Sequence, residues 1–135
     1  MKVKIIDLPK IEDLRGNLTF VESEGHFPFE LKRSYWIFDV PSGMNRGGHA
    51  FKEQKEVIIA LSGSLDVLVN DGMEEKMFSL NRSNKALYVP NGIWREMLNF
   101  STNSLALVLS STFFSESDYV RDIQVFKKMI DSGEL

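Results

Sequence analysis

The sequence has 135 residues, 43% of them hydrophobic and ten of them Phe, which suits one domain with a core that needs no metal or disulfide. It contains no cysteine, and this excludes a disulfide framework, a thiol nucleophile and a thiolate metal site. The net charge of −3, with acids and bases interspersed, excludes a broad basic surface, so we expect no nucleic-acid partner.

The N-terminal segment, residues 1–10, reads MKVKIIDLPK. Its apolar part is too short, and too soon followed by charge, for a secretory signal, and no apolar run in the chain approaches the length of a membrane span. We therefore expect a cytoplasmic protein without a membrane partner. Residues 3–8, VKIIDL, are predicted to form a strand that could pair along a sheet edge.

Short apolar or alternating runs continue to residue 111. Val, Ile, Phe and Tyr recur in them with a period of two, and Gly, Pro, Asn or Asp separates them, which is typical of strands. The predicted strands are 3–8, 17–22, 34–40, 56–63, 64–70, 75–80, 86–90 and 104–111. This spacing indicates an all-β sandwich or barrel over about residues 1–112. Asn70-Asp71-Gly72 predicts a hairpin turn, because Asp-Gly tolerates positive φ.

After Ser111 the pattern becomes helical. Residues 115–118 offer N-cap side chains, and apolar residues then recur with helical spacing. They are Tyr119, Val120, Ile123, Phe126, Met129 and Ile130. We predict one helix over about residues 115–131, packed on the barrel and stopped near Gly133. No linker or repeat interrupts the chain, so residues 1–135 are predicted to form a single domain.

Residues 43–63, GMNRGGHAFKEQKEVIIALSG, keep the spacing of the first cupin motif. The positions that match it are Gly43, His49, Phe51, Glu56 and Gly63, with Phe51 in place of a second His. Residues 90–95, together with Asn99, resemble the second cupin motif, with Arg95 in place of its His. The resemblance to cupins implies a double-stranded β-helix, or jelly-roll barrel.

A typical metal cupin holds iron or manganese through three His and one Glu. Those positions hold His49, Phe51, Glu56 and Arg95 here. A phenyl ring cannot ligate, and a guanidinium stays protonated, offers no lone pair and repels a cation. We predict that no metal binds there and that Glu56 and Arg95 form a buried ion pair in the vacated space.

Over almost its whole length the chain resembles the sugar-nucleotide 3,4-ketoisomerases, cupins that convert dTDP-4-dehydro-6-deoxyglucose into its 3-keto isomer. The segments that carry the resemblance are 13–18, 28–29, 32–33, 35–39, 46–50, Lys52, 87–90, Trp94 and 118–121. The family has a second His at Phe51 and a further His at Arg95. The resemblance implies a dTDP-sugar substrate, no cofactor, a homodimer with exchanged N-terminal strands, and a place in deoxysugar biosynthesis for lipopolysaccharide or S-layer glycan.

This isomerisation passes through an enediol and needs a base, an acid and stabilisation of the enediolate, but neither nicotinamide nor metal. His49 is the predicted base, or a base and acid in one, because an imidazole exchanges protons near neutrality. Arg46 and Tyr35 are the candidates for stabilising the enediolate. Strand alternation puts Tyr35 on the opposite face from Trp36, and the resemblance points that face at the pocket; a core aromatic with a satisfied hydroxyl remains an alternative.

Arginines suit the pyrophosphate, because planar guanidinium groups match phosphate oxygens. Arg15, Arg33 and Arg82 are the candidates, each with the alternative of a solvated surface charge. Gln54 is a candidate for binding sugar hydroxyls. Lys52 is a further candidate for binding the substrate, because it is one of the residues that carry the resemblance.

Two further functions stay open besides the ketoisomerase. One is an epimerase of the related barrel type, which returns a proton to the other face of a ring carbon without moving the carbonyl. The other is a barrel that only binds a nucleotide sugar or serves an active relative as a partner.

Overall fold

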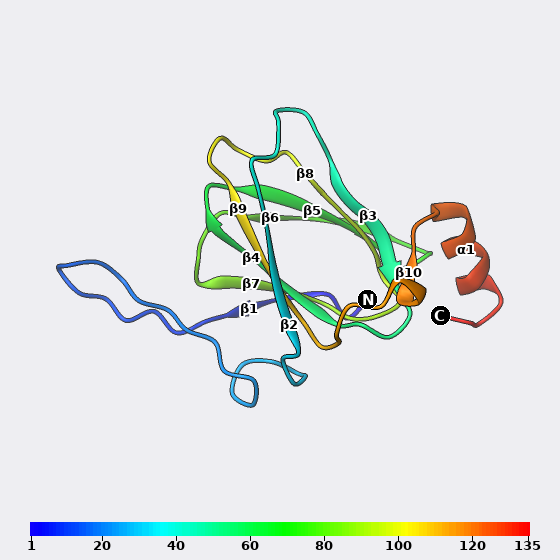
Figure 1. Cartoon of the computed structure of the whole chain (residues 1–135), viewed down its shortest axis with the longest axis horizontal. Helices are drawn as coiled ribbons and strands as arrows, with labels where there is room; N and C mark the ends of the chain where they lie inside the picture. The colour runs from blue at the N-terminus through cyan, green and yellow to red at the C-terminus, as the bar shows by residue number, and fades with distance from the viewer.

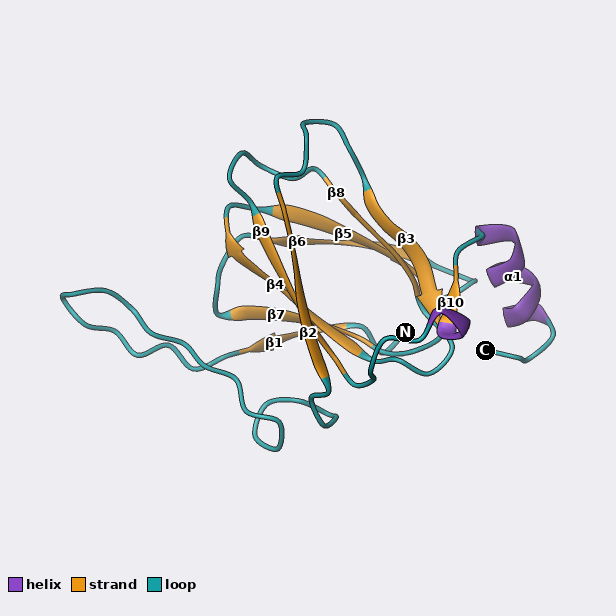
Figure 2. Ribbon diagram, in the orientation of Figure 1, coloured by secondary structure: helices purple, strands orange, loops and turns teal.

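Two five-stranded antiparallel sheets face each other across the core in the computed structural model, which describes residues 1–135 (Figures 1 and 2). In sheet order, the first contains β1 (Lys4–Asp7), β7 (Lys85–Val89), β4 (Glu56–Ser62), β9 (Leu105–Ser110) and β2 (Arg33–Phe38). The second contains β10 (Tyr119–Val120), β3 (Arg46–Phe51), β8 (Trp94–Leu98), β5 (Leu65–Asn70) and β6 (Glu75–Leu80). The predicted all-β barrel with one C-terminal helix is confirmed.

The main core lies between the two sheets, where 13 buried residues form one cluster. Alternation along the strands fills it: in β5, Leu65, Val67 and Val69 are all at most 1% exposed, while the residues between them are partly exposed. Ile58 of β4 and Val108 of β9 face them from the first sheet. The period of two in the sequence therefore records the two faces of each sheet.

Seven of the eight predicted strands are strands in the structure, and the prediction for residues 17–22 is wrong. That run lies in an arm, residues 8–32, which leaves the sheets and projects at the left of Figure 1. The only ladder contact of residues 17–22 is the bridge between Ile11 and Leu18, within the arm itself. Strands β3 and β8 were not predicted, because β3 begins with Arg-Gly-Gly and β8 carries two charged residues, both contrary to an apolar strand pattern.

The hairpin at Asn70-Asp71-Gly72 is confirmed. It joins β5 to β6, and Gly72 has a φ of +95°. The Asn70 Oδ1 accepts from the Gly72 N–H at 2.6 Å, and the Asp71 Oδ1 accepts from the N–H groups of residues 73 and 74 at 2.9 Å. Side-chain acceptors thus fix a loop of four residues, two more than the shortest hairpins use.

The C-terminal helix α1 spans Ile123–Asp131 and so begins later than the predicted residue 115. Residues Glu116–Asp118 form a 3₁₀ turn, and Tyr119–Val120 pair with β3 as strand β10. The cap is Asp122, whose carboxylate accepts from the N–H groups of residues 124 and 125 at 2.8 and 3.2 Å. The predicted stop is confirmed, because Gly133 has a φ of +79° just past the last turn.

Helix α1 packs through Phe126, which has no exposed surface, against Trp94 of β8, with 5.9 Å between the ring centroids. Ala50 and Val120 complete this small cluster. The helix therefore fastens the C-terminal segment to the strand that carries His49. The structure contains no helix with the length and apolar character needed to cross a lipid bilayer.

Candidate active site

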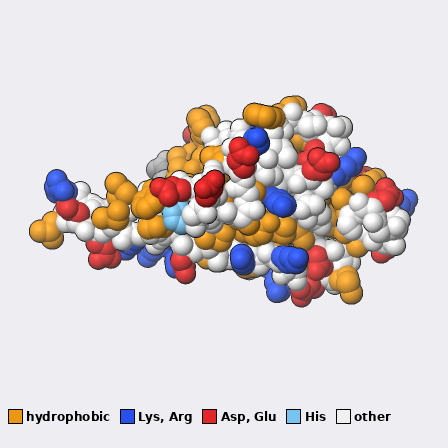
Figure 3. All heavy atoms as spheres, turned by 90° about the horizontal axis from the view of Figure 1, so that it is seen from below, with side chains coloured by type: hydrophobic (Ala, Val, Ile, Leu, Met, Phe, Trp, Pro, Cys, Tyr) orange, Lys and Arg blue, Asp and Glu red, His pale blue; other side chains and the backbone are white.

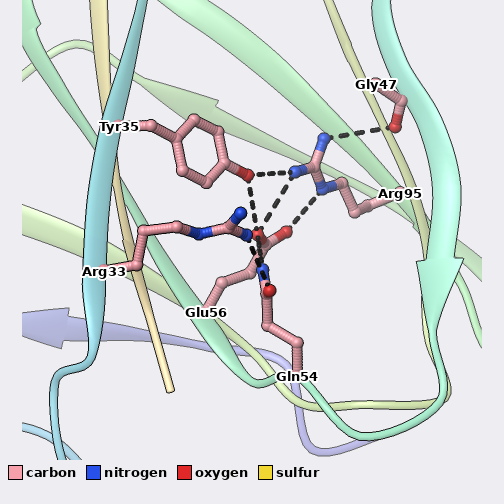
Figure 4. A network of polar contacts seen from close by, with 6 residues as sticks. All are labelled: Arg33, Tyr35, Gly47, Gln54, Glu56 and Arg95. Atoms are coloured by element: carbon pink, nitrogen blue, oxygen red, sulfur yellow. Dashed lines mark hydrogen bonds and ion pairs between the residues drawn. The ribbon is translucent and has the colours of Figure 1, made fainter. Parts of the chain in front are cut away.

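An ion pair lies at the centre of the polar network in Figure 4. Glu56 opens β4 and Arg95 lies in β8, and the side chain of each is at most 2% exposed. The Arg95 Nε donates to Glu56 Oε1 at 2.5 Å, and its Nη2 donates to Oε2 at 3.2 Å. The predicted buried ion pair is confirmed. Its guanidinium lies where a metal cupin has its fourth ligand, so the residues present do not suit a cation.

The guanidinium of Arg95 remains charged in this setting. Burial alone would lower the pKa of Arg95, but the negative charge of Glu56 and the oxygen of Tyr35 outweigh that effect and raise it. Its Nη1 donates to the Gly47 carbonyl at 3.2 Å. A Cβ on Gly47, whose φ is +69°, would lie 2.0 Å from that Nη1, so only glycine fits beside Arg95.

Tyr35 points from β2 into the barrel, the direction that the family resemblance implied (Figure 4). Its hydroxyl donates to Glu56 Oε2 at 3.2 Å and accepts from Arg95 Nη2 at 3.0 Å. Burial, and then the charge of Glu56, raise the pKa of Tyr35 well above its usual range. The phenol therefore stays protonated and is held in one orientation.

Arg33 and Gln54 extend the network toward the barrel end. Gln54 is 2% exposed; its Nε2 donates to Glu56 at 3.3 Å, and its Oε1 accepts from Arg33 Nη2 and from Thr112, both at 2.9 Å. The Arg33 guanidinium also lies over the rings of Tyr35 and Phe114, 5.2 and 5.5 Å from their centroids. Both side chains thus support the ion pair, and the amide of Gln54 is already occupied by protein groups.

A cavity of about 290 Å³ opens beside this network. Strands β2 and β3, Arg95, and the segment after the 3₁₀ turn form its walls. The lining residues are Tyr35, Trp36, Ile37, Arg46, Gly47, His49, Arg95, Tyr119 and Arg121. The structure therefore brings together the three predicted catalytic candidates, His49, Tyr35 and Arg46.

His49 lines this cavity and has a ring nitrogen without a hydrogen-bond partner. The residue is 7% exposed, and its Nε2 is buried without a hydrogen-bond partner. The rings of Phe51 and Tyr119 pack edge-on against it, 4.7 and 5.0 Å away between centroids. Burial, then the charges of Arg95 and Arg121, lower the pKa of His49 to about 3. The imidazole is therefore neutral near pH 7, which a proton-abstracting base must be.

The other predicted binding residues lie outside this cavity. Arg15 is 90% exposed near the tip of the arm and pairs with Asp13 at 2.9 Å. Arg82, in the loop between β6 and β7, lines a different polar cavity together with Lys10. Lys52 is exposed just after β3. Within one chain, the structure does not bring these three cations to His49.

Tyr119 and Arg121 line the cavity but were not predicted as site residues. The segment 118–121 belonged to the family resemblance, yet its residues were assigned to a helix. Pairing of Tyr119 with Phe51 and of Val120 with Ala50 carries this segment alongside His49. That pairing depends on tertiary structure, so no local pattern signals it.

The sequence matches the family model described as WxcM-like, C-terminal (FdtA), over residues 1–131. It is 38% identical over 130 residues to a TDP-4-oxo-6-deoxy-alpha-D-glucose-3,4-oxoisomerase from Aneurinibacillus thermoaerophilus, covering 96% of this chain and 94% of the relative. The chain belongs to the sugar-nucleotide 3,4-ketoisomerase family.

Solved structures agree with this membership. A 3,4-ketoisomerase from Helicobacter canadensis has a TM-score of 0.94 at 40% identity, covering 97% of this chain and 98% of the other. A His-to-Asn variant of a ketoisomerase from Thermoanaerobacterium thermosaccharolyticum, in complex with TDP-4-keto-6-deoxyglucose, has a TM-score of 0.93 at 33% identity over 96% and 94%. A dTDP-4-dehydrorhamnose 3,5-epimerase from Bacillus anthracis, 15% identical with a TM-score of 0.79 over 89% and 78%, shares the fold alone.

Proposed function

We propose that this chain is a dTDP-sugar 3,4-ketoisomerase, which moves the keto group of a dTDP-4-dehydro-6-deoxyhexose from carbon 4 to carbon 3. The observation that carries the proposal is a neutral His49 that lines a cavity with cationic walls and whose Nε2 has no hydrogen-bond partner. The reaction is inferred from the relatives, which are 3,4-oxoisomerases and 3,4-ketoisomerases. The epimerase alternative has less support, because the ketoisomerases share 33–40% of this sequence and the epimerase 15%.

In the proposed mechanism His49 removes the proton from carbon 3. The electron pair of that bond forms the carbon 3–carbon 4 double bond, and the carbonyl oxygen on carbon 4 becomes an enediolate oxygen. The proton of the carbon 3 hydroxyl then moves to the oxygen on carbon 4 as the carbon 3 carbonyl forms, and carbon 4 takes a proton from the imidazolium of His49. Hydrogen leaves carbon 3 and enters carbon 4, with no net oxidation. A single imidazole is sufficient for both transfers at carbon when it takes the proton from carbon 3, exchanges it with solvent and delivers one to carbon 4.

Arg46 is the better candidate for stabilising the enediolate. It lines the cavity, is exposed and takes part in no ion pair of the chain, so its charge is free to meet a ligand. The hydroxyl proton of Tyr35 is committed to Glu56, and we therefore assign Tyr35 to holding the ion pair in place. A donor aimed at the developing oxyanion is typically worth about 3 kcal/mol.

The reaction is tested by NMR in heavy water, with chelator-treated protein and dTDP-4-dehydro-6-deoxyglucose. We expect a 3-keto sugar carrying deuterium at carbon 4, at a rate that the chelator leaves within about twofold, because a guanidinium holds the former metal position. Exchange without migration of the carbonyl would identify an epimerase. An unchanged sugar spectrum with broadened dTDP signals would identify a binding protein.

We propose a homodimer in which N-terminal segments are exchanged. In a single chain, the arm exposes Ile11, Leu14 and Leu18, and edge strand β2 exposes Trp36 and Phe38, each by more than half. Figure 3 shows hydrophobic side chains running along the arm and onto the body. Exposed apolar surface of this extent is typical of an interface, and a second copy would cover it.

Light scattering tests the dimer. We expect a mass of twice the 15.4 kDa chain, and Leu14→Glu is expected to weaken the dimer by at least about tenfold, since it places a charge in a buried contact. Met73→Glu is the control, because Met73 is 93% exposed in the β5–β6 hairpin. A monomeric wild-type chain would contradict the proposal. We further propose a cytoplasmic location without nucleic-acid or membrane partners, on the basis of the composition and the interspersed charges of the chain.

A further inference from the structure

The cavity has a cationic group in the segment that follows β10. The guanidinium of Arg121 lies over the ring of Tyr119, 4.1 Å from its centroid. Tyr119 in turn packs edge-on against His49 and Phe51, with centroids 5.0 and 4.6 Å away. Arg121 is 55% exposed in its side chain and lines the cavity. Its charge is thus fixed at the mouth, one aromatic ring away from the base.

In the structure this guanidinium is occupied by an anion of the same chain. Arg121 Nε donates to Glu116 Oε1 at 3.0 Å, and Arg121 Nη2 donates to Oε2 at 3.1 Å. A guanidinium also binds phosphate oxygens in this bidentate geometry. Both side chains are more than half exposed, and an exposed ion pair contributes little net stability. A ligand with greater charge can therefore displace Glu116.

We propose that Glu116 is an internal counter-ion of Arg121, displaced by the diphosphate when the nucleotide sugar enters the cavity. This inference rests on the proposed function, which supplies the diphosphate. Of the other cavity cations, Arg95 is saturated by Glu56, Tyr35 and Gly47, so it has no free face for a phosphate. Arg121 is the cation that can exchange one bidentate anion for another.

Displacement of Glu116 by the diphosphate also changes the charge around the His49 imidazole. The charged and titratable groups that face the imidazole are Tyr35 from β2, Arg46 on its own strand β3, Arg95 from β8 and Tyr119 and Arg121 from the C-terminal segment. Arg121 is one of the charges that depress its basicity. A diphosphate held by Arg121 brings more negative charge than the Glu116 carboxylate and stabilises the imidazolium. His49 thus becomes a stronger base when the nucleotide sugar fills the cavity.

Calorimetry with dTDP on the full chain tests the exchange through two opposite changes. Arg121→Gln is expected to weaken dTDP binding by at least about tenfold, the loss of a charge-assisted bidentate contact. Glu116→Gln is expected to strengthen it by about twofold to fivefold, because the competing anion is gone. Lys76→Gln and Glu75→Gln make the same charge changes on β6, at the opposite edge of the second sheet, and are expected to leave affinity unchanged.

A purely structural ion pair would give a different result. Loss of either partner would then loosen the same segment, and both variants would change affinity in the same direction, which would overturn the inference. Unchanged affinity in both would overturn it as well, while leaving the proposed function intact. Failure of the wild-type chain to bind dTDP would overturn the proposed function too.

The imidazole resonances of His49 give a second readout. Saturation with dTDP is expected to raise the pKa of His49 in the wild type, and the rise is expected to be smaller in Arg121→Gln. An equal rise in both proteins would show that the diphosphate acts on His49 without Arg121, and would overturn the coupling.

Discussion

His49→Asn is expected to lower turnover by about 10²–10⁴-fold, the usual contribution of a general base, while dTDP affinity stays within about twofold. Asn keeps a polar group of similar reach but cannot accept a proton near neutrality. The Nε2 of His49 has no hydrogen-bond partner, so its loss breaks no network. The NMR assay in heavy water measures turnover, and calorimetry measures affinity.

The second histidine of the chain provides the control. His26 lies in the arm, where its Nδ1 accepts from the Glu22 N–H at 3.0 Å, and His26→Asn is expected to leave both quantities unchanged. Full turnover in His49→Asn would remove His49 from the mechanism. A large loss of dTDP affinity would instead make His49 a binding residue.

The pH dependence follows from the low pKa of His49. The base must be neutral, and in the free protein it gains a proton only near pH 3, so kcat/KM should show no loss on crossing pH 6.5.

The stability of the fold also depends on pH through His49. Because the unfolded chain protonates this group near pH 6.5 and the folded chain near pH 3, stability contributed by neutral His49 is present above pH 6.5 and falls as the pH drops below it.

The strands that could be predicted are those whose two faces differ in polarity. β3 and β8 were missed because their inward side chains include His49 and Arg95 instead of aliphatic residues, and a period of two in hydrophobicity does not register polar residues that point inward. The opposite error arose at residues 17–22, where alternation exists without a sheet to join. Local alternation reports which residues suit a strand, but not whether a partner strand is present.

The site residues likewise fall into those that local sequence predicts and those that depend on tertiary structure. Fixed spacing identified His49, Glu56 and Arg95, because they belong to two short motifs whose residues the barrel always brings together. Arg33 and Gln54, predicted as ligand-binding residues, lie in the polar network around Glu56, where protein groups hold them; that depends on the packing of Phe114 and Thr112. The contribution of Arg121 depends on β10 pairing with β3 across some 70 residues of chain, which no local pattern encodes.

The largest effect on stability is expected from Arg95→Met, which should lower the free energy of unfolding by about 3–5 kcal/mol at pH 7. The substitution removes the partner of a carboxylate that is 1% exposed, so the charge of Glu56 is left buried and unpaired. It also removes the donors to Tyr35 and Gly47. Urea unfolding followed by tryptophan fluorescence measures the loss, and Lys76→Met, an exposed substitution, should cost less than about 0.5 kcal/mol.

The double variant Glu56→Gln, Arg95→Met separates charge from shape. If the cost arises from an uncompensated carboxylate, neutralising Glu56 should restore a large part of the stability, because a neutral amide in the same place needs only hydrogen bonds from Gln54 and Tyr35. A deficit that persists in the double variant would show that Arg95 stabilises the barrel by filling space, and that its charge matters only to the cavity beside His49.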